Sequence, residues 1–237
     1  MAQNGDDRTM NLGPLDPPPE LTEETQAALK HESREVEVDL SGKKVKIYLE
    51  EVTPANGAPT LDVLLVHSGT CSSADWVKIR TVYHLANWGY RAVAIDLPGK
   101  GKSPSAIDKN LFGDFVSALV DSLTLKNAVF ITPSSGGRYT QPYLFNNPAT
   151  STERAVGFVP IAPADTGLYA PKFKDSQVPT LILYGSKDPR GPTSQNDLVG
   201  LTNHKIAVLE DADHACYLEK PDEFHKVLYN WLKDLRK

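Results

Sequence analysis

Cysteine, long hydrophobic runs and secretion signals are scarce or missing in this sequence. Two of its 237 residues are cysteine, Cys71 and Cys216, and the chain contains no Asn-x-Ser/Thr glycosylation sequon. Secreted proteins commonly carry disulfides or sequons, so we expect a reducing location, which is cytoplasmic and also compatible with the nucleus. No apolar stretch approaches the roughly 18 residues that a transmembrane helix needs, and residues 1–7 lack a signal-peptide core. We therefore expect no membrane attachment.

Positive charge is also in deficit. The formal net charge is −5, and residues 1–31 alone contain six acids and two bases. A chain without a basic excess is a poor ligand for nucleic acid, so we expect no direct nucleic-acid binding. Histidines, cysteines and acids do not occur at metal-ligand spacing, so we also expect no metal.

Composition divides the chain into a tail and a domain. Residues 1–32 are acidic and rich in proline, which predicts a disordered N-terminal tail with a short helix after Leu21. The chain as a whole is 40% hydrophobic, which is enough for the core of one domain over residues 33–237.

Eight short apolar runs alternate with helical patterns after the tail. The first two are joined by a Ser-Gly turn and predict an antiparallel hairpin, and the later ones follow a βαβ order. The expected strands are 35–40, 45–50, 61–66, 91–97, 128–132, 156–161, 180–184 and 205–209. They predict an α/β fold whose eight-stranded sheet is mostly parallel, with an antiparallel edge and helices on both faces. Only residues 162–179 separate the sixth and seventh strands, which leaves little or no lid.

A pair of serines lies where the fifth expected strand meets a helix, in the segment TPSSGG. Strand, tight turn and helix form the nucleophile elbow of α/β-hydrolases, whose serine needs small residues two places before and after it. With Ser134 as the nucleophile these residues are threonine and glycine, whereas Ser135 would put a proline ring into the crowded turn. Ser134 is therefore the preferred nucleophile. The alternative is a plain Gly/Ser loop, because the first glycine of G-x-S-x-G is missing.

An acid and a base follow at later strand ends. Asp188 comes just after the seventh expected strand, and His214 lies in the loop after the eighth. Ser…Asp…His is the chain order of α/β-hydrolases. Asp211 and Asp213 are the competing acids, but both are too close in sequence to His214 to approach its far ring nitrogen easily. Taken singly, Asp188 fits an Asp-Pro turn and His214 a solvated loop residue.

The loop after the third expected strand begins with His67 and is similar to the HG loop that supplies an oxyanion donor in α/β-hydrolases. Here Ser68 follows the histidine and glycine comes one place later. The backbone N–H groups of Gly69 and Ser135 are therefore the expected oxyanion hole. His67 is expected to be structural, because a base there would break the chain order. Cys71 either lines the site or is a small buried hydrophobe.

A second motif matches the end of a phosphate-binding P-loop, Gly101-Lys102-Ser103. The opening glycine of that motif would fall at Asp96, and Pro104 stands where its helix should begin. A glycine-rich turn after a buried strand is the better interpretation.

Five segments together resemble the small α/β-hydrolase-domain-containing proteins of the fourteenth subgroup. They are YRAVAIDLPGKGKS, ITPSSGGRYTQPYL, VGFVPIAPADT, LILYGSKDP and DHACYLEKPDEFH, and the resemblance runs from about residue 35 to the C-terminus. It implies an α/β-hydrolase fold with Ser134 as nucleophile, Asp188 as acid and His214 as base. It also implies a cytosolic or nuclear protein that hydrolyses small model esters. A transfer of the acyl group to coenzyme A and an association with a transcription-initiation factor are implied as well.

Three residues depart from the pattern of that family. Ser68 replaces the glycine of HG, Thr132 stands where serine is usual, and Asp213 replaces the glycine before the base, where it adds a negative charge. These changes leave the three expected catalytic residues in place but bear on the rate and on the oxyanion geometry.

The sequence therefore predicts a serine hydrolase that acts on small acyl esters, thioesters or activated amides through an acyl-enzyme. No bound cofactor is expected, and the expected partner is a small-molecule acyl substrate. Two alternatives stay open. One is an acyltransferase or lysine deacylase that passes the acyl group to coenzyme A, and the other is a non-catalytic interaction module that keeps the fold.

Overall fold

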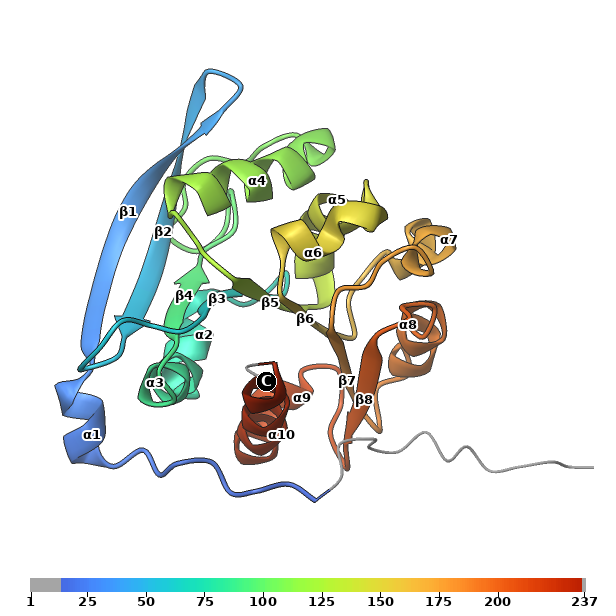
Figure 1. Cartoon of the computed structure of the whole chain (residues 1–237). Helices are drawn as coiled ribbons and strands as arrows, with labels where there is room; N and C mark the ends of the chain where they lie inside the picture. Colours follow the sequence, from blue (N-terminus) through green and yellow to red (C-terminus); the bar gives the residue numbers. More distant parts are fainter. Residues whose placement is uncertain (1–13, 236–237) are drawn as a thin grey trace, which may run out of the picture.

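Eight strands form one sheet in the computed structural model, which describes residues 14–235, and helices cover both faces of the sheet (Figure 1). The strands are β1 (Lys30–Leu40), β2 (Lys43–Thr53), β3 (Asp62–Leu65), β4 (Arg91–Ile95), β5 (Ala128–Pro133), β6 (Gly157–Ile161), β7 (Thr180–Gly185) and β8 (His204–Leu209). The α-helices are α1 (Glu23–Ala28), α2 (Ser73–Lys78), α3 (Thr81–Asn87), α4 (Phe112–Ser122), α5 (Gly137–Phe145), α6 (Ser151–Arg154), α7 (Ala170–Phe173), α8 (Gly191–Leu198), α9 (Cys216–Glu219) and α10 (Pro221–Asp234). Short 3-10 turns connect several of them: η1 (Lys109–Leu111), η2 (Ser134–Gly136), η3 (Pro148–Thr150) and η4 (Thr166–Leu168).

The strand order across the sheet is β1-β2-β4-β3-β5-β6-β7-β8. β2 pairs antiparallel with both β1 and β4, and the other neighbouring strands pair parallel. The predicted α/β fold with a mostly parallel eight-stranded sheet and an antiparallel edge is confirmed. Parallel strands end at one edge of a sheet, so the loops after β3, β5, β7 and β8 meet there.

The hairpin of β1 and β2 is longer than its apolar pattern predicted. Its ladder covers all eleven residues of β1, whereas the expected strand began at residue 35. Polar contacts between side chains of β1 and β2 stabilise the additional paired residues. Nε2 of His31 lies 2.9 Å from Oε2 of Glu50, and the guanidinium of Arg34 lies 2.7 Å from Glu51. Such pairs stabilise a ladder without the apolar alternation that reveals a strand in the sequence.

β1 is also an edge of the sheet, and its two faces differ. Val38 and Leu40 point into the core and are buried, whereas Glu35, Glu37 and Asp39 alternate with them and are exposed. Alternation of this kind is typical of a strand with one face on the core and one in water.

Residues 14–32, which composition placed in a disordered tail, have ordered structure. α1 begins after Thr22, whose hydroxyl caps its first turn. Farther upstream, Oδ1 of Asn230 accepts the N–H of Asp16, and Nδ2 of Asn230 donates to the Asp16 carbonyl. These contacts with α10 order a segment whose composition alone favours disorder, and the boundary expected at residue 32 lies inside β1. Residues 1–13 of the predicted tail lie outside the described residues.

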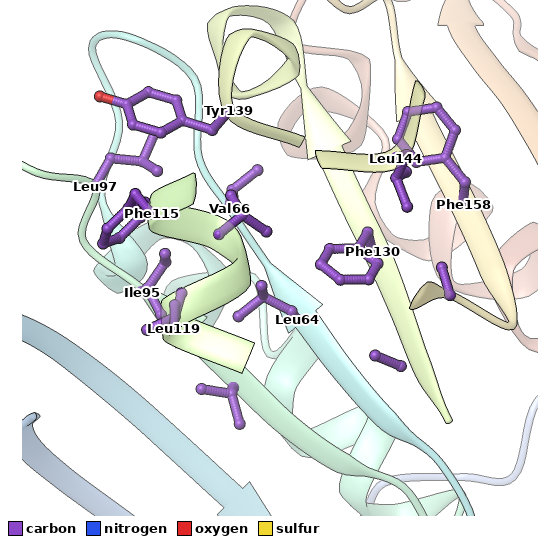
Figure 2. Close-up of a cluster of buried hydrophobic side chains, with 14 of the residues drawn as sticks. Leu64, Val66, Ile95, Leu97, Phe115, Leu119, Phe130, Tyr139, Leu144 and Phe158 are labelled. Atoms are coloured by element: carbon purple, nitrogen blue, oxygen red, sulfur yellow. The ribbon is translucent and has the colours of Figure 1, made fainter. Parts of the chain in front are cut away.

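Two hydrophobic layers, one on each face of the sheet, form the core. On one face Phe115 and Leu119 of α4 pack with Phe130 of β5 and Phe158 of β6, and all four side chains are fully buried (Figure 2). On the other face, α10 presents apolar residues spaced three and four apart: Phe224, Val227, Leu228 and Trp231. Burying each such side chain contributes roughly 1.5–3 kcal/mol, so these layers hold the strand ends in place.

Two histidines pack against each other between α3 and α10. The ring centroids of His84 and His225 are 4.3 Å apart. Nε2 of His225 is hydrogen-bonded to Oγ1 of Thr81 at 2.9 Å, whereas Nδ1 of both rings is buried without a hydrogen-bond partner. Burial lowers the pKa of His84 to about 4 and that of His225 to about 3. Both rings are therefore neutral near neutral pH.

We expect these histidines to weaken the fold in acid. In the unfolded chain an imidazole binds its proton near about pH 6.5, whereas the folded rings stay neutral down to about 4 and about 3. The unfolded state therefore takes up more protons between these values, and the free energy of unfolding falls as the pH drops through this window. Each proton contributes a slope of roughly 1.4 kcal/mol per pH unit. Urea unfolding of His84→Phe at a series of pH values should show a shallower loss than the unsubstituted protein, and equal slopes would contradict the expectation.

Candidate active site

Ser134 lies on a tight turn between β5 and α5. Its φ is +46°, a left-handed conformation that costs a residue with a Cβ on the order of 1–3 kcal/mol. The two following glycines allow the close approach that the turn requires. A Cβ at Gly136 would lie 2.6 Å from Cγ2 of Val66, and one at Gly137 would lie 2.8 Å from Cβ of Pro163. The segment TPSSGG thus has the strained strand-turn-helix geometry of a nucleophile elbow, with Ser134 at the turn.

The three side chains expected to be catalytic form one hydrogen-bonded array. Nε2 of His214 lies 2.8 Å from Oγ of Ser134, and Nδ1 lies 2.5 Å from Oδ2 of Asp188. The Asp188 side chain is fully buried, and its Oδ1 accepts the N–H of Arg190 at 2.9 Å. A carboxylate on Nδ1 favours the tautomer whose Nε2 is free to accept a proton. This Ser134–His214–Asp188 array can therefore activate the serine hydroxyl.

Close packing of two loops brings the acid to the histidine. Asp188 follows β7 and His214 follows β8, the neighbouring parallel strand. The N–H of Lys187 donates to the carbonyl of Ala212 at 2.9 Å, and a Cβ at Gly185 would lie 2.2 Å from that same oxygen. Only a glycine at the end of β7 therefore lets the two loops approach so closely.

The competing residues have other partners. Oδ1 of Asp211 lies 3.1 Å from Nζ of Lys187, and Oδ1 of Asp213 accepts the backbone N–H of His214 at 2.7 Å. The imidazole of His214 uses both of its nitrogens on Ser134 and Asp188. Of the two adjacent serines, Ser134 therefore provides the hydroxyl in the array, and Asp188 provides the carboxylate.

The two residues expected to supply the oxyanion donors, Gly69 and Ser135, lie next to each other. A Cβ on Gly69 would come within 3.2 Å of Oγ of Ser135, so the loop after β3 packs against the residue that follows Ser134. An oxyanion hole needs two backbone N–H groups close together, and this packing brings the two residues near each other from separate loops.

His67 holds the loop after β3 in place. Its Nδ1–H donates to the carbonyl of Ser68 at 2.6 Å, and its Nε2 accepts the N–H of Leu97 at 2.9 Å. The ring is buried, and burial lowers its pKa, so it stays neutral in this role. The structural role expected for His67 agrees with these contacts. Cys71 in the same loop is half-buried and accepts the hydroxyl of Ser68 at 3.0 Å.

Both cysteines are free thiols. Cys71 lies in the loop after β3, and Cys216 is fully buried at the start of α9, where burial raises its pKa to about 12. A thiol with so high a pKa is a poor nucleophile, so Cys216 is a packing residue.

The P-loop-like segment does not have the geometry of a phosphate site. The carboxylate of Asp96 accepts the N–H groups of Lys102 and Ser73, both at 2.7 Å, and the hydroxyl of Ser103 donates to the carbonyl of Asp96. The Asp96 carboxylate thus already binds the Lys102 N–H, a backbone group that a phosphate in this segment would need. A Cβ at Gly101 would lie 2.1 Å from that carboxylate. The segment is a glycine-rich turn built around Asp96.

The connection between β6 and β7 is short and leaves the site uncovered by any inserted domain. It spans residues 162–179 and contains only η4 and α7. Beside α5 it borders a hollow of about 430 Å³ whose lining includes Lys109, Asn110, Phe112, Asp114, Arg138 and Leu168. Over residues 14–235, no helix is long and apolar enough to cross a membrane, and no group of three or more histidines, cysteines or acids could hold a metal ion.

Two residues beside the elbow escaped the sequence analysis, Gln141 and Ala164. Nε2 of Gln141, which is fully buried in α5, donates to the Ala164 carbonyl at 2.7 Å. The N–H of Ala164 donates in turn to the Ser134 carbonyl at 2.8 Å. No local sequence pattern predicts a structural role for a glutamine inside a short helix. The contact between Gln141 and Ala164 also joins segments more than twenty residues apart.

Comparison with known proteins finds relatives that match most of this chain. A protein of Rattus norvegicus named "Putative protein-lysine deacylase ABHD14B" is 41% identical over 196 residues, which cover 80% of this chain and 91% of the rat protein. Protein ABHD14A of Danio rerio is 36% identical over 199 residues, which cover 80% of this chain and 72% of its own length. No family model matches the chain.

Solved structures with low sequence identity share the fold. A predicted CIB-like hydrolase from Thermoplasma acidophilum superposes with a TM-score of 0.73 at 21% identity, covering 86% of this chain and all of the other. The carboxylesterase CesB from Bacillus subtilis has a TM-score of 0.68 at 18% identity, covering 88% of this chain and 94% of its own. The sequence relatives show more than the fold, because they match most of both chains at 41% and 36% identity. This protein belongs to the ABHD14 family of α/β hydrolases.

Proposed function

We propose that this protein is a serine hydrolase that forms an acyl-enzyme on Ser134. The observation that carries the proposal is the Ser134–His214–Asp188 array, in which distances of 2.8 Å and 2.5 Å link hydroxyl, imidazole and carboxylate. A chance cluster of polar side chains would not also place the serine at φ +46° on a glycine-lined turn. Strain of this kind is concentrated at functional sites.

The first half of the reaction acylates the enzyme. Oγ of Ser134 attacks the carbonyl carbon of the substrate while Nε2 of His214 takes the hydroxyl proton, and Asp188 stabilises the imidazolium. The N–H groups of Gly69 and Ser135 bind the oxyanion that forms. When the tetrahedral intermediate collapses, the bond to the leaving group breaks, and His214 gives that group its proton.

The second half returns the free enzyme. A water molecule attacks the acyl-serine while His214 takes one of its protons. Collapse of the second intermediate breaks the bond to Oγ of Ser134, which receives the proton from His214, and the acid is released. The short connection over residues 162–179 offers little apolar cover for a long chain. We therefore propose small acyl esters, thioesters and activated amides as the substrates.

Labelling with a fluorophosphonate probe tests the proposal, because the probe reacts only with an activated serine. A folded protein that does not label would favour the non-catalytic alternative, an interaction module for a protein partner. From the family resemblance, we propose a transcription-initiation factor as that partner.

A second candidate function is removal of an acyl group from lysine with transfer to coenzyme A. The absence of an inserted domain over residues 162–179 favours it, because a polypeptide carrying the acyl-lysine needs an open approach to Ser134. The name of the rat relative, "Putative protein-lysine deacylase ABHD14B", covers the removal of an acyl group from lysine and does not name the acceptor. The acyl-enzyme is the same, and the thiol of coenzyme A replaces water in the second half.

Incubation of an acetyl-lysine peptide with and without coenzyme A separates the two acceptors. For a hydrolase we expect free acetate and lysine peptide in both samples, because water completes the reaction. Product that appears only with coenzyme A, together with acetyl-coenzyme A in equal amount, would instead assign the transferase. The variant Ser134→Ala serves as the control, and it should give neither product.

A further inference from the structure

The peptide between Ser134 and Ser135 is fixed from its carbonyl side. The Ser134 carbonyl accepts the N–H of Ala164 at 2.8 Å and that of Gly137 at the start of α5. In a planar trans peptide the C=O and the N–H point in opposite directions. The position of Ala164 therefore sets the direction of the Ser135 N–H, which is the proposed oxyanion donor. Donors on the carbonyl also polarise the peptide and strengthen that N–H.

Ala164 lies in a backbone segment held in unfavourable conformations. Ala162 has φ +41° and Asp165 has φ +64°. Each costs on the order of 1–3 kcal/mol and persists only where surrounding contacts enforce it. One such contact is the bond from Nε of Arg138 to Asp165 at 2.9 Å, but both side chains are close to half exposed, and exposed ion pairs contribute little. A stronger constraint on the conformation of this segment therefore has to come from a buried side chain.

Gln141 provides the internal contact. Its side chain is fully buried, and Nε2 donates to the carbonyl of Ala164 at 2.7 Å and to that of Gly137 at 3.1 Å. One amide group thus joins both residues whose N–H groups bind the Ser134 carbonyl. Oε1 of Gln141 is buried without a hydrogen-bond partner. Because an unsatisfied acceptor is unfavourable, packing alone would favour an apolar side chain of this size.

We propose that Gln141 is a positioning residue for the oxyanion hole. It holds Ala164 against the Ser134 carbonyl and so keeps the Ser135 N–H aimed at the oxyanion. The inference rests on the proposed function and goes beyond it, because it gives a part to a side chain outside the Ser134–His214–Asp188 array.

The variant Gln141→Met tests the inference, because methionine conserves the size and removes both N–H donors. Loss of a whole oxyanion donor costs about 10²–10³-fold in kcat, and a misaimed donor should cost less. We expect kcat for p-nitrophenyl acetate to fall about 10–100-fold with little change in KM. The inhibition constant of a boronic acid, which forms a tetrahedral adduct on serine, should rise by a similar factor.

Gln195→Met is the matched control. Gln195 is also buried and also has one unpartnered amide atom, but it lies on α8 and accepts the hydroxyl of Tyr184. Thermal unfolding should show comparable losses of stability in both variants, while kcat should stay near the unsubstituted value in Gln195→Met. Should Gln141→Met fail to fold, Gln141→Leu replaces it. Leucine is apolar and cannot donate to the Ala164 carbonyl, so the same loss is expected.

The outcomes separate the two proposals. An active parent protein whose Gln141 variant keeps its kcat and its boronic acid affinity would overturn the role of Gln141 and leave the hydrolase intact. Equal kinetic losses in the Gln141 and Gln195 variants would overturn it too, because they would reflect stability alone. A folded parent protein that neither labels with a fluorophosphonate nor cleaves esters would overturn both proposals.

Discussion

Ser134→Ala should abolish fluorophosphonate labelling and lower ester hydrolysis at least about 10³-fold, with the fold retained. The hydroxyl of Ser134 is the group that His214 contacts at 2.8 Å, and alanine leaves the imidazole without a nucleophile to activate. The side chain is small and only partly buried, so its removal should hardly affect thermal unfolding. Probe labelling, hydrolysis of p-nitrophenyl acetate and circular dichroism together check this result.

Ser135→Ala is the matched control for that variant. The proposed part of Ser135 is its backbone N–H, which alanine keeps, so most of the activity should remain. An inactive Ser135→Ala beside an active Ser134→Ala would mean that the nucleophile is one residue later than proposed.

Asp188→Asn should lower kcat by roughly 10³–10⁴-fold. The buried carboxylate accepts Nδ1–H of His214 at 2.5 Å and so presents a free Nε2 to the serine. An asparagine amide can donate to Nδ1 instead, which stabilises the wrong tautomer and removes the charge that supports the imidazolium. Steady-state kinetics with p-nitrophenyl acetate measure the loss.

Asp213→Asn is the control for charge near the imidazole. Its carboxylate accepts only the backbone N–H of His214 among the hydrogen bonds resolved in residues 14–235, so the variant should stay within a few-fold of the parent kcat. If Asp213→Asn lost as much activity as Asp188→Asn, the assignment of the acid would be wrong.

The sequence alone indicated most of the fold and the arrangement at the strand ends. Ser134 directly follows an apolar strand, and Asp188 and His214 lie in the loops after two others, so local patterns of strand ends point to all three. The parallel order of the strands then brings them to one edge. Local signals of this kind do not depend on contacts between distant segments, so they can be recognised in a single sequence.

Features that depend on distant contacts could not be predicted. The first five residues of β1 pair with β2 although their side chains are polar, and Asp16 is held by Asn230, which lies 214 positions away. Gln141 acts on the elbow only because Ala164 folds back onto α5. In each case the local sequence is polar and unremarkable, and the partner that gives it a defined conformation is visible only in three dimensions.

The long edge strand β1 bears on how copies of this protein behave toward one another. An exposed edge of eleven residues offers unpaired N–H and C=O groups on which a second sheet could grow. Glu35 and Glu37 bring exposed carboxylates into that surface, while Asp39 is paired with Lys44 at 3.1 Å, so two such edges meeting side by side would repel each other. The charges on the exposed face of β1 thereby discourage aggregation through the sheet edge, and carboxylate-to-amide changes there should promote it.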